Sequence, residues 1–386
     1  MKTVYVRNIP IGPNHPIVIQ SMTNTKTKDV EATVKQINDL ANAGAQIVRM
    51  AIADMKDAEA IREIKKQTNI PLVADIHFDY RLALKAIENG IDKLRLNPGN
   101  IKDPSQIKQV VLACKEKKIP IRIGINGGSL NSEIYEKYGH TPMALVESAR
   151  EHINILESLD FYDIVISLKD TDINITLEAN RLASKIFKYP LHIGLTEAGT
   201  ITSGTIRSSY VLGTLLNEKI GNTIRVSLTA NPLEEIKVVK EILKMTNNYN
   251  GPTIISCPTC GRTDYDMLSI IEQLEPLIEK LNKPLKIAIM GCVVNGPGEA
   301  KDADIGIAGG KNQVVLFKKG QIIKNTKEEN IVDEGEIKVG SKVIHTYFGY
   351  GIVVEADDRF IKVLFEKGSE IKKLTKNHPT ITKIKN

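Results

Sequence analysis

The first part of the chain alternates between short apolar runs and longer amphipathic segments, and this alternation limits the possible folds more than any other feature. Runs rich in branched apolar residues predict strands at residues 17–22, 46–52, 70–77, 91–97, 119–126, 162–169, 190–197 and 222–229. Helical spacing predicts helices at residues 30–43, 58–66, 80–88, 106–117, 144–158, 175–187, 205–216 and 233–245. Strands that are each followed by a helix, eight times over, predict an α/β fold with a (β/α)8 TIM-type barrel over residues 1–245. A doubly wound open sheet is the alternative, although no glycine-rich dinucleotide fingerprint follows the first strand.

Composition bounds the remainder of the chain. The 386 residues are enough for a barrel of about 250 residues and smaller modules. No apolar signal core or bilayer-spanning run is found, so we expect a cytoplasmic protein without membrane contact. The net charge is +6, and residues 336–386 supply +4 of it, with ten Lys or Arg against six Asp or Glu. The remainder is nearly neutral, which argues against a general nucleic-acid binder.

Two smaller units are predicted after the barrel. A polar linker at 246–252 leads into an α/β unit at 252–330, with strands at 252–256, 285–290, 305–308 and 314–317 and a helix at 267–281. The polar stretch 318–334 is predicted to be a second linker. Short apolar runs at 342–345, 351–355 and 360–365 predict a small all-β module at 336–386.

Three of the four cysteines lie in the second unit. Cys257 and Cys260 follow one predicted strand, and Cys292 follows the next. Parallel strands joined by a helix would bring these ends together, and in a reducing compartment such a motif indicates metal or redox chemistry. Three thiolates with a nearby carboxylate suit an iron–sulfur cluster that keeps one iron for chemistry, and a three-cysteine zinc site is the alternative. Cys114 is predicted to be a core residue of a barrel helix.

The predicted barrel strands end in polar and charged residues. Chemistry in such barrels gathers at the carboxyl ends of the strands. Five of these ends carry a cation, namely Arg49, Arg95, Arg122, Lys169 and Arg225. Buried cations need partners, and Asp75 and Glu197 are too few to neutralise them. We therefore expect an anionic ligand with several charges, such as a diphosphate, because arginine binds phosphate oxygens in a bidentate manner. Salt bridges to the outer helices are the alternative.

Together these motifs resemble a known family over about residues 1–320. They lie at residues 48–51, 74–77, 94–100, 122–126, 167–169, 192–199, 257–262 and 291–299. In this order they resemble the 4-hydroxy-3-methylbut-2-enyl diphosphate synthases, the bacterial iron–sulfur oxidoreductases of the non-mevalonate isoprenoid pathway. The resemblance implies a TIM barrel followed by an α/β iron–sulfur domain similar to part of a sulfite reductase. It also implies a homodimer in which the barrel of one chain faces the cluster domain of the other.

The resemblance assigns roles to individual residues. It implies a [4Fe–4S] cluster held by Cys257, Cys260, Cys292 and Glu299. We hypothesise in addition that Glu299 is a catalytic residue that moves a proton to the departing oxygen. Glu197 is expected to be a partner of the arginines. The implied substrate-binding residues are Arg49, His77, Arg95, Asn97, Arg122, Asn126, Lys169, Arg225, Ser227 and Asn295.

The implied reaction is a reductive ring opening and dehydration. The substrate would be 2-C-methyl-D-erythritol 2,4-cyclodiphosphate and the product (E)-4-hydroxy-3-methylbut-2-enyl diphosphate. Two electrons would arrive singly from flavodoxin or ferredoxin. Two other interpretations remain open: a phosphate-binding barrel synthase of the dihydropteroate type with a structural zinc site, and a zinc-containing nucleic-acid-binding protein.

The residues from about 336 onward depart from this family pattern. Residues 340–354 and 361–365 resemble the small Tudor-like barrel of some helicases and transcription-coupling factors. Such modules usually bind proteins. The positive balance, with Tyr347, Phe348, Tyr350 and Phe360, also permits weak nucleic-acid contact. A module without a partner is the remaining alternative.

Overall fold

The computed structural model divides into two compact units, Met1–Tyr249 and Asn250–Asn386. It describes residues 1–386 except 78, 102, 264, 280, 282, 293–295, 311–312, 327–336, 338, 340, 346–348, 358, 366–370, 376–380 and 385–386. No helix in the described part of the chain is long and apolar enough to cross a membrane.

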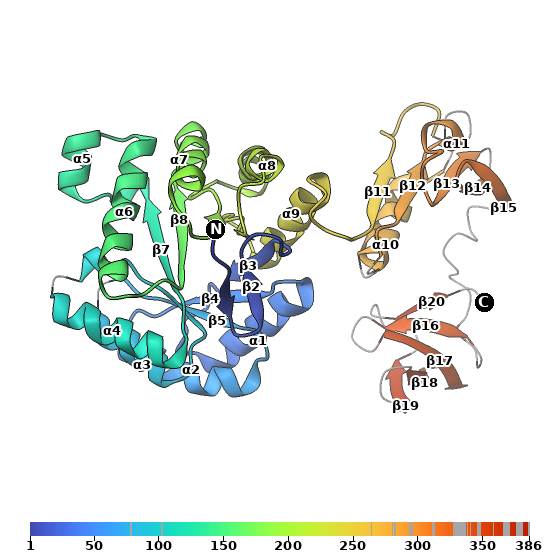
Figure 1. The fold of residues 1–386 in the computed structure, drawn as a ribbon. Coiled ribbons are helices and arrows are strands. Elements are labelled where there is room, and N and C mark those ends of the chain that lie inside the picture. The colour runs from blue at the N-terminus through green and yellow to red at the C-terminus, as the bar shows by residue number, and fades with distance from the viewer. Residues whose placement is uncertain are drawn as a thin grey trace. The chain divides into compact units, whose positions relative to one another are not determined.

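Eight parallel strands form the centre of the first unit (Figure 1). Their spatial order is β8-β7-β6-β5-β4-β3-β10-β9. A parallel bridge between Ile166 and Leu191 links the two ends of this order, so the sheet is nearly closed. The predicted TIM-type barrel is therefore confirmed. The strands are β3 (Val18–Met22), β4 (Ile47–Ala51), β5 (Leu72–Asp75), β6 (Lys93–Arg95), β7 (Ile121–Asn126), β8 (Ile164–Lys169), β9 (His192–Ile193) and β10 (Thr223–Ile224).

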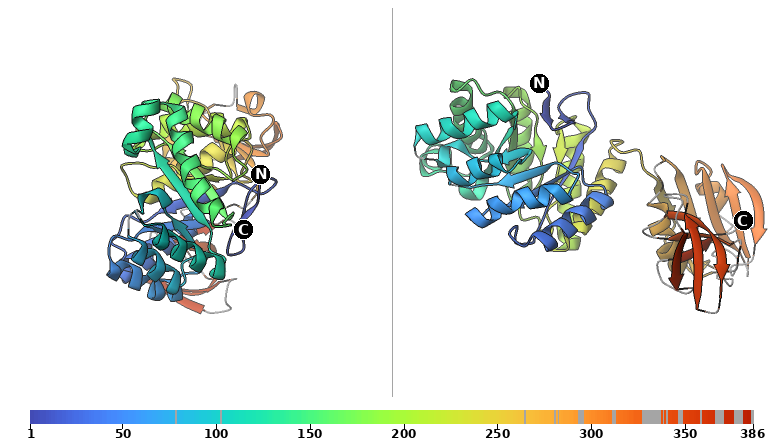
Figure 2. Two further views of the ribbon diagram at one scale, coloured as in Figure 1. Left: turned by 60° about the vertical axis from the view of Figure 1, so that its left-hand side comes forward. Right: turned by 90° about the horizontal axis from the view of Figure 1, so that it is seen from below.

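Helices surround these strands on the outside, as the other views also show (Figure 2). They are α1 (Val30–Ala43), α2 (Met55–Gln67), α3 (Tyr80–Glu88), α4 (Pro104–Lys117), α5 (Ser132–Tyr138), α6 (Pro142–Ser158), α7 (Ile173–Ile186), α8 (Ile201–Asn217) and α9 (Pro232–Met245). Most begin at an Asp, Asn or Thr whose side chain accepts a hydrogen bond from the first turn, as Asp29 does for α1. Helix α5 was not predicted, because its seven residues are too few for a helical period to emerge.

A short hairpin packs on the barrel where the strands begin. Its strands are β1 (Val4–Val6) and β2 (Ile9–Ile11), which pair in antiparallel register. Ile11 and Val6 are fully buried and pack in one cluster with Val18, Ile47 and Val73, at the amino ends of β3, β4 and β5. The hairpin therefore adds apolar packing to the end of the barrel opposite the strand ends that carry the cations.

The second unit contains a mixed sheet in the order β11-β12-β13-β14-β15. Its elements are β11 (Thr253–Ser256), α10 (Met267–Ile278), β12 (Lys286–Met290), α11 (Gly296–Glu299), β13 (Ile305–Gly310), β14 (Gln313–Lys318) and β15 (Gln321–Thr326). Because β11 and β12 are parallel neighbours, Cys257 and Gly291 emerge at the same edge. The predicted linker is wrong over 321–326, where polar residues form the edge strand β15. Its remainder, 327–334, lies outside the described residues.

A separate antiparallel sheet follows, in the order β19-β18-β17-β16-β20. Its strands are β16 (Lys342–His345), β17 (Gly349–Ala356), β18 (Phe360–Phe365), β19 (Ile371–Thr375) and β20 (Ile381–Ile384). The all-β character of the tail is confirmed, although its lysine-rich last two strands were not predicted. The sheet has its own apolar cluster, centred on Val343, Val353 and Val363. Separate domains at 252–330 and 336–386 remain a prediction, and Tyr347 and Phe348 lie outside the described residues.

We predict that Ile11→Ala lowers the free energy of unfolding of the barrel by about 2–5 kcal/mol, because it leaves a cavity in a fully buried apolar cluster. Tyr5→Ala is the matched control on the same hairpin, since Tyr5 is 57% exposed, and a change within about 0.5 kcal/mol is expected. Denaturant unfolding followed by circular dichroism measures both variants. A change for Ile11→Ala as small as that expected for Tyr5→Ala would show that the hairpin does not contribute to the barrel core.

Candidate functional site

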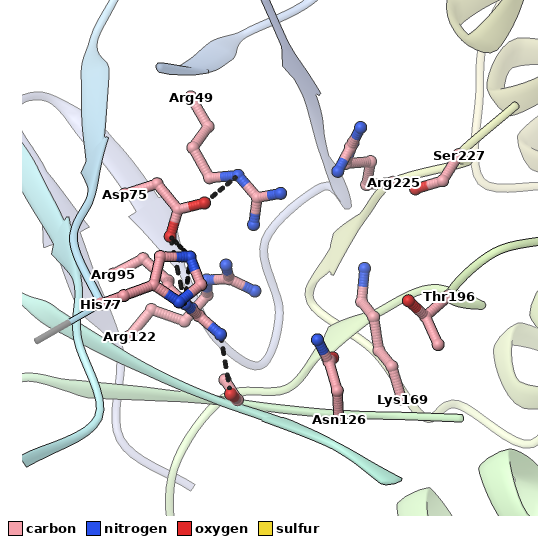
Figure 3. A pocket seen from close by; sticks show the side chains of 11 residues that line it. Arg49, Asp75, His77, Arg95, Arg122, Asn126, Lys169, Thr196, Arg225 and Ser227 are labelled. Atoms are coloured by element: carbon pink, nitrogen blue, oxygen red, sulfur yellow. Dashed lines mark hydrogen bonds and ion pairs between the residues drawn. The ribbon is translucent and has the colours of Figure 1, made fainter. Parts of the chain in front are cut away.

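A polar pocket of about 210 Å³ lies at the carboxyl ends of the barrel strands (Figure 3). It brings together eight of the side chains that the sequence singles out for substrate binding. These are Arg49, His77, Arg95, Arg122, Asn126, Lys169, Arg225 and Ser227. Asp75, Gly124 and Thr196 complete the lining. The predicted residue Asn295 lies outside the described residues.

Asp75 orients two of the arginines. Its Oδ2 lies 3.6 Å from Arg49 Nε, and its Oδ1 lies 3.3 Å from Arg95 Nη1. Arg49 also donates from Nη2 and Nε to the sulfur of Met22, at 2.8 and 3.0 Å. Burial raises the pKa of Asp75, but the surrounding arginines outweigh it, so the net shift is downward and the carboxylate stays charged.

Arg225 has its carboxylate on a helix. Arg225 Nε lies 3.6 Å from Glu235 Oε2 of α9, and Glu235 Oε1 accepts a hydrogen bond from Leu228 N at 3.0 Å. Glu235 was not predicted as a site residue, because it lies on a helix and not at the end of a strand. The sequence does contain a pattern that indicates its burial: Glu235 occupies a core-facing position of the amphipathic helix α9, next to Ile236 and four residues before Val239. The expectation that Glu197 pairs with the arginines is wrong: Glu197 is exposed and forms no ion pair within the described parts of the chain.

Arg122 and Lys169 are buried without a carboxylate partner among the residues that the structure describes. They are 2% and 7% exposed. Burial, followed by the neighbouring cations, lowers the pKa of each well below its ordinary value. Burial also lowers the pKa of Arg49 to about 10. Five basic side chains, four of them arginines, thus face two buried carboxylates, and the pocket is a site for an anion.

Two glycines leave room for these long side chains. A Cβ on Gly194 would collide with Lys169 Nζ, and one on Gly124 would lie 3.0 Å from Arg95 Nε. Asn97 does not line the pocket. Its amide instead donates to Gly124 O and accepts from Gly124 N, both at 2.9 Å, so it ties β6 to β7. A direct role of Asn97 in binding stays a prediction.

His77 lies at the edge of the pocket beside Asp75 and Arg95. Its Nε2 is 3.2 Å from Arg95 Nη1 and 3.9 Å from Asp75 Oδ1. Burial and then Arg95 lower its pKa, which favours the neutral imidazole. His192, also at a predicted strand end, is fully buried, and its Nδ1 lies 2.6 Å from Thr223 Oγ1. His77 therefore lies in the pocket lining as a neutral imidazole in contact with Arg95.

A second pocket, of about 250 Å³, gathers the predicted cluster ligands. Cys257, Cys260, Cys292 and Glu299 line it, together with Pro258, Arg262 and Met290. None of the four cysteines forms a disulfide. Gly291 N donates to Cys257 Sγ at 3.0 Å, and Glu299 ends the short helix α11. Cys114, in contrast, is fully buried in the barrel, as expected of a core residue.

The donor atoms of this second pocket suit an iron–sulfur group. Three thiols and a carboxylate surround a cavity, and a cluster takes each of its ligands on a separate iron. Within the described residues, no three such side chains lie close enough together to hold one ion. The residues present therefore fit a cluster bound inside a cavity.

Comparisons with known proteins agree with this arrangement. The GcpE TIM-barrel domain matches residues 1–240, and the GcpE protein C-terminal domain matches residues 253–340. Relatives from Fusobacterium nucleatum and Clostridium perfringens are each 58% identical over 335 residues, covering 86% of this chain and 95% and 96% of theirs. A relative from Halalkalibacterium halodurans is 54% identical over 349 residues, covering 90% of this chain and 95% of its own. All three are named 4-hydroxy-3-methylbut-2-en-1-yl diphosphate synthase (flavodoxin).

Among solved structures, dihydropteroate synthase from Stenotrophomonas maltophilia matches 63% of this chain and 98% of its own, with a TM-score of 0.46 and 12% identity. A likeness this distant carries no argument about function. The two domain families reach residue 340, so the Tudor-like resemblance of the tail stays a prediction. From the two domain matches and the identity to the named relatives, the chain belongs to the GcpE family of 4-hydroxy-3-methylbut-2-en-1-yl diphosphate synthases.

Proposed function

We propose that this protein is the oxidoreductase that converts 2-C-methyl-D-erythritol 2,4-cyclodiphosphate to (E)-4-hydroxy-3-methylbut-2-enyl diphosphate in isoprenoid biosynthesis. The observation that carries the proposal is the pocket in which five cations face two carboxylates. A cyclic diphosphate brings two adjacent negative phosphoryl groups, which supply the missing charge. The names of the relatives support the same reaction, and the dihydropteroate-type alternative is not favoured.

The cations divide into two groups in this proposal. Arg49, Arg95 and Arg225 are oriented by carboxylates, so they present fixed donors to the ligand. Arg122 and Lys169, which lack such partners among the described residues, pair with the phosphoryl oxygens directly. The neutral groups that complete the site are His77, Asn126, Thr196 and Ser227. We also assign Asn295 to substrate binding, and Asn97 supports the site through its bonds to Gly124.

Cys257, Cys260, Cys292 and Glu299 would hold a [4Fe–4S] cluster. When bound, such a cluster supplies single electrons and an iron that can act as a Lewis acid. Glu299 is the acid closest in sequence to the last cysteine and the carboxylate of the pocket lining, so we assign it the proton that moves to the departing oxygen. Overall the reaction takes up two electrons together with protons, breaks the carbon–oxygen bond to the ring phosphate and one carbon–hydroxyl bond, and releases that hydroxyl oxygen as water.

The electron donor proposed here is flavodoxin, because the relatives carry that word in their names, with ferredoxin as the other candidate.

We further propose a homodimer that places a barrel pocket opposite a cluster pocket. We also propose a cytoplasmic location, where free thiols such as these persist. The tail module is proposed to bind a protein, with weak nucleic-acid contact as the alternative.

We predict that Arg122→Met lowers kcat/KM for the cyclodiphosphate by about 100- to 1,000-fold. The substitution removes a buried positive charge whose proposed partner is a phosphoryl oxygen of the ligand. Arg181→Met is the control, since Arg181 is paired with Glu178 and Glu218 on the outside of the barrel. Steady-state kinetics with a chemical reductant measures both. Wild-type kcat/KM in Arg122→Met would contradict the proposed binding site.

Two variants test the second pocket separately from the first. Cys260→Ser is expected to lose iron and sulfide and the visible absorption of the purified protein, because a thiolate ligand is removed. Glu299→Gln is expected to keep much of the iron but to change the absorption spectrum and lower turnover. Anaerobic purification with metal and sulfide analysis gives the answer. Full turnover and an unchanged spectrum in Glu299→Gln would rule out both roles of Glu299.

A chain that ends at Glu334 is expected to keep its turnover, because the tail has an apolar cluster and sheet of its own. The measurement is kcat and KM of the truncated and full-length proteins under the same anaerobic conditions. Loss of activity, with iron content retained, would instead mean that the tail serves the reaction directly.

A further inference from the structure

A lysine lies inside the barrel beneath the anion pocket and takes no part in the site described above. Lys93 begins β6 and is fully buried. Side chains two residues apart on a strand point to the same side, so Lys93 follows the direction of Arg95, which lines the pocket. The strand register agrees, because Lys93 pairs with Val73 and Arg95 with Asp75 on β5. Lys93 therefore lies one step deeper in the barrel than the pocket lining.

The ammonium position of Lys93 has no hydrogen-bond partner among the described residues. The charged and titratable groups on the surrounding strands are mostly cationic. They are Arg49 on β4, Asp75 on β5, Arg95 on β6, Arg122 on β7, Lys169 on β8, His192 on β9 and Arg225 after β10. Asp75 is engaged by two arginines, and Glu235 of α9 is engaged by Arg225.

Such surroundings favour the neutral amine. Burial, then Arg122, then Arg49 lower the pKa of Lys93 well below its ordinary value. A neutral amine without a partner still costs free energy compared with an apolar side chain of the same length. Stability of the empty barrel therefore gives no reason for a lysine at this position. A doubly charged anion in the pocket above would lower the positive potential at Lys93 and so favour its protonated form.

We propose that Lys93 takes up a proton when a diphosphate occupies the pocket, so that binding of the anion is coupled to proton uptake. The inference rests on the proposed function for the class of ligand and extends it to a residue outside the pocket lining. Because the complex holds more protons than the free protein, affinity falls as pH rises through the pKa that Lys93 has in the complex. Below the pKa of the free protein, affinity no longer depends on this group.

Proton uptake is measurable directly by titration calorimetry. The anaerobically purified holoenzyme is titrated with 2-C-methyl-D-erythritol 2,4-cyclodiphosphate, without reductant, in buffers of different ionisation enthalpy at several pH values. Each phosphoryl group of this ligand has one strongly acidic oxygen, so the ligand itself does not titrate near neutral pH. The dependence of the observed heat on the buffer gives the number of protons taken up per bound ligand.

Lys93→Met is the test variant, and Lys115→Met, at an exposed position of α4, is the matched control. Lys169 also has a lowered pKa, so the wild type is expected to take up protons at both lysines. Lys93→Met is expected to take up fewer, by as much as one per chain, and to show a shallower fall of affinity with pH. Its melting temperature is expected to rise, and Lys115→Met is expected to match the wild type in proton uptake.

Two outcomes would count against different claims. Unchanged proton uptake and pH dependence in Lys93→Met, with the ligand still bound, would overturn the role of Lys93 alone. Failure of the wild type to bind the cyclodiphosphate would overturn the proposed function, and this inference with it. Lys93→Gln, which keeps the length and polarity without a titratable group, gives the same comparison if the methionine variant does not fold.

Discussion

The concentration of positive charge inside a rigid barrel is the constraint on which the site depends. Arg49, Arg95, Arg122, Lys169 and Arg225 converge on one pocket, and like charges at such distances repel. Two carboxylates and the fixed ends of parallel strands hold them together. Much of the compensating charge is left for a ligand to provide. Ligand binding therefore contributes to the stability of this region as well as to recognition, because an anion bound to the folded state alone shifts the folding equilibrium.

The same feature of parallel strands organises both pockets. In the barrel, neighbouring strands end side by side and gather their last side chains at one mouth. In the second unit, β11 and β12 are parallel neighbours, so Cys257 and the loop that carries Cys292 meet at one edge. Residues far apart in sequence become neighbours because of topology. The chain thus places anion binding and thiol ligands in two separate units by one structural rule.

The sequence predicted those features that depend on periodicity along a single segment. The barrel strands, their helices and the cations at the strand ends all follow from local patterns. What it missed depends on contacts between segments. Glu235 lies on helix α9 and forms its ion pair with Arg225 from there. Asn97 follows β6 as predicted, but its side-chain amide is hydrogen-bonded to the backbone of Gly124 instead of lining the pocket. Strand β15 was taken for a linker because an edge strand needs few apolar residues.

The choice between arginine and lysine in the barrel also has a physical consequence. An arginine keeps its charge under almost all conditions, whereas a buried lysine readily loses its proton. The arginines therefore set a fixed field that selects anions over neutral molecules. Lys93 and Lys169, both deeply buried, provide charge that adjusts to the ligand. A pocket built from arginine alone would keep its full repulsion in the empty state. A buried lysine that loses its proton, whether in the pocket lining as Lys169 or below it as Lys93, reduces that repulsion until an anion binds.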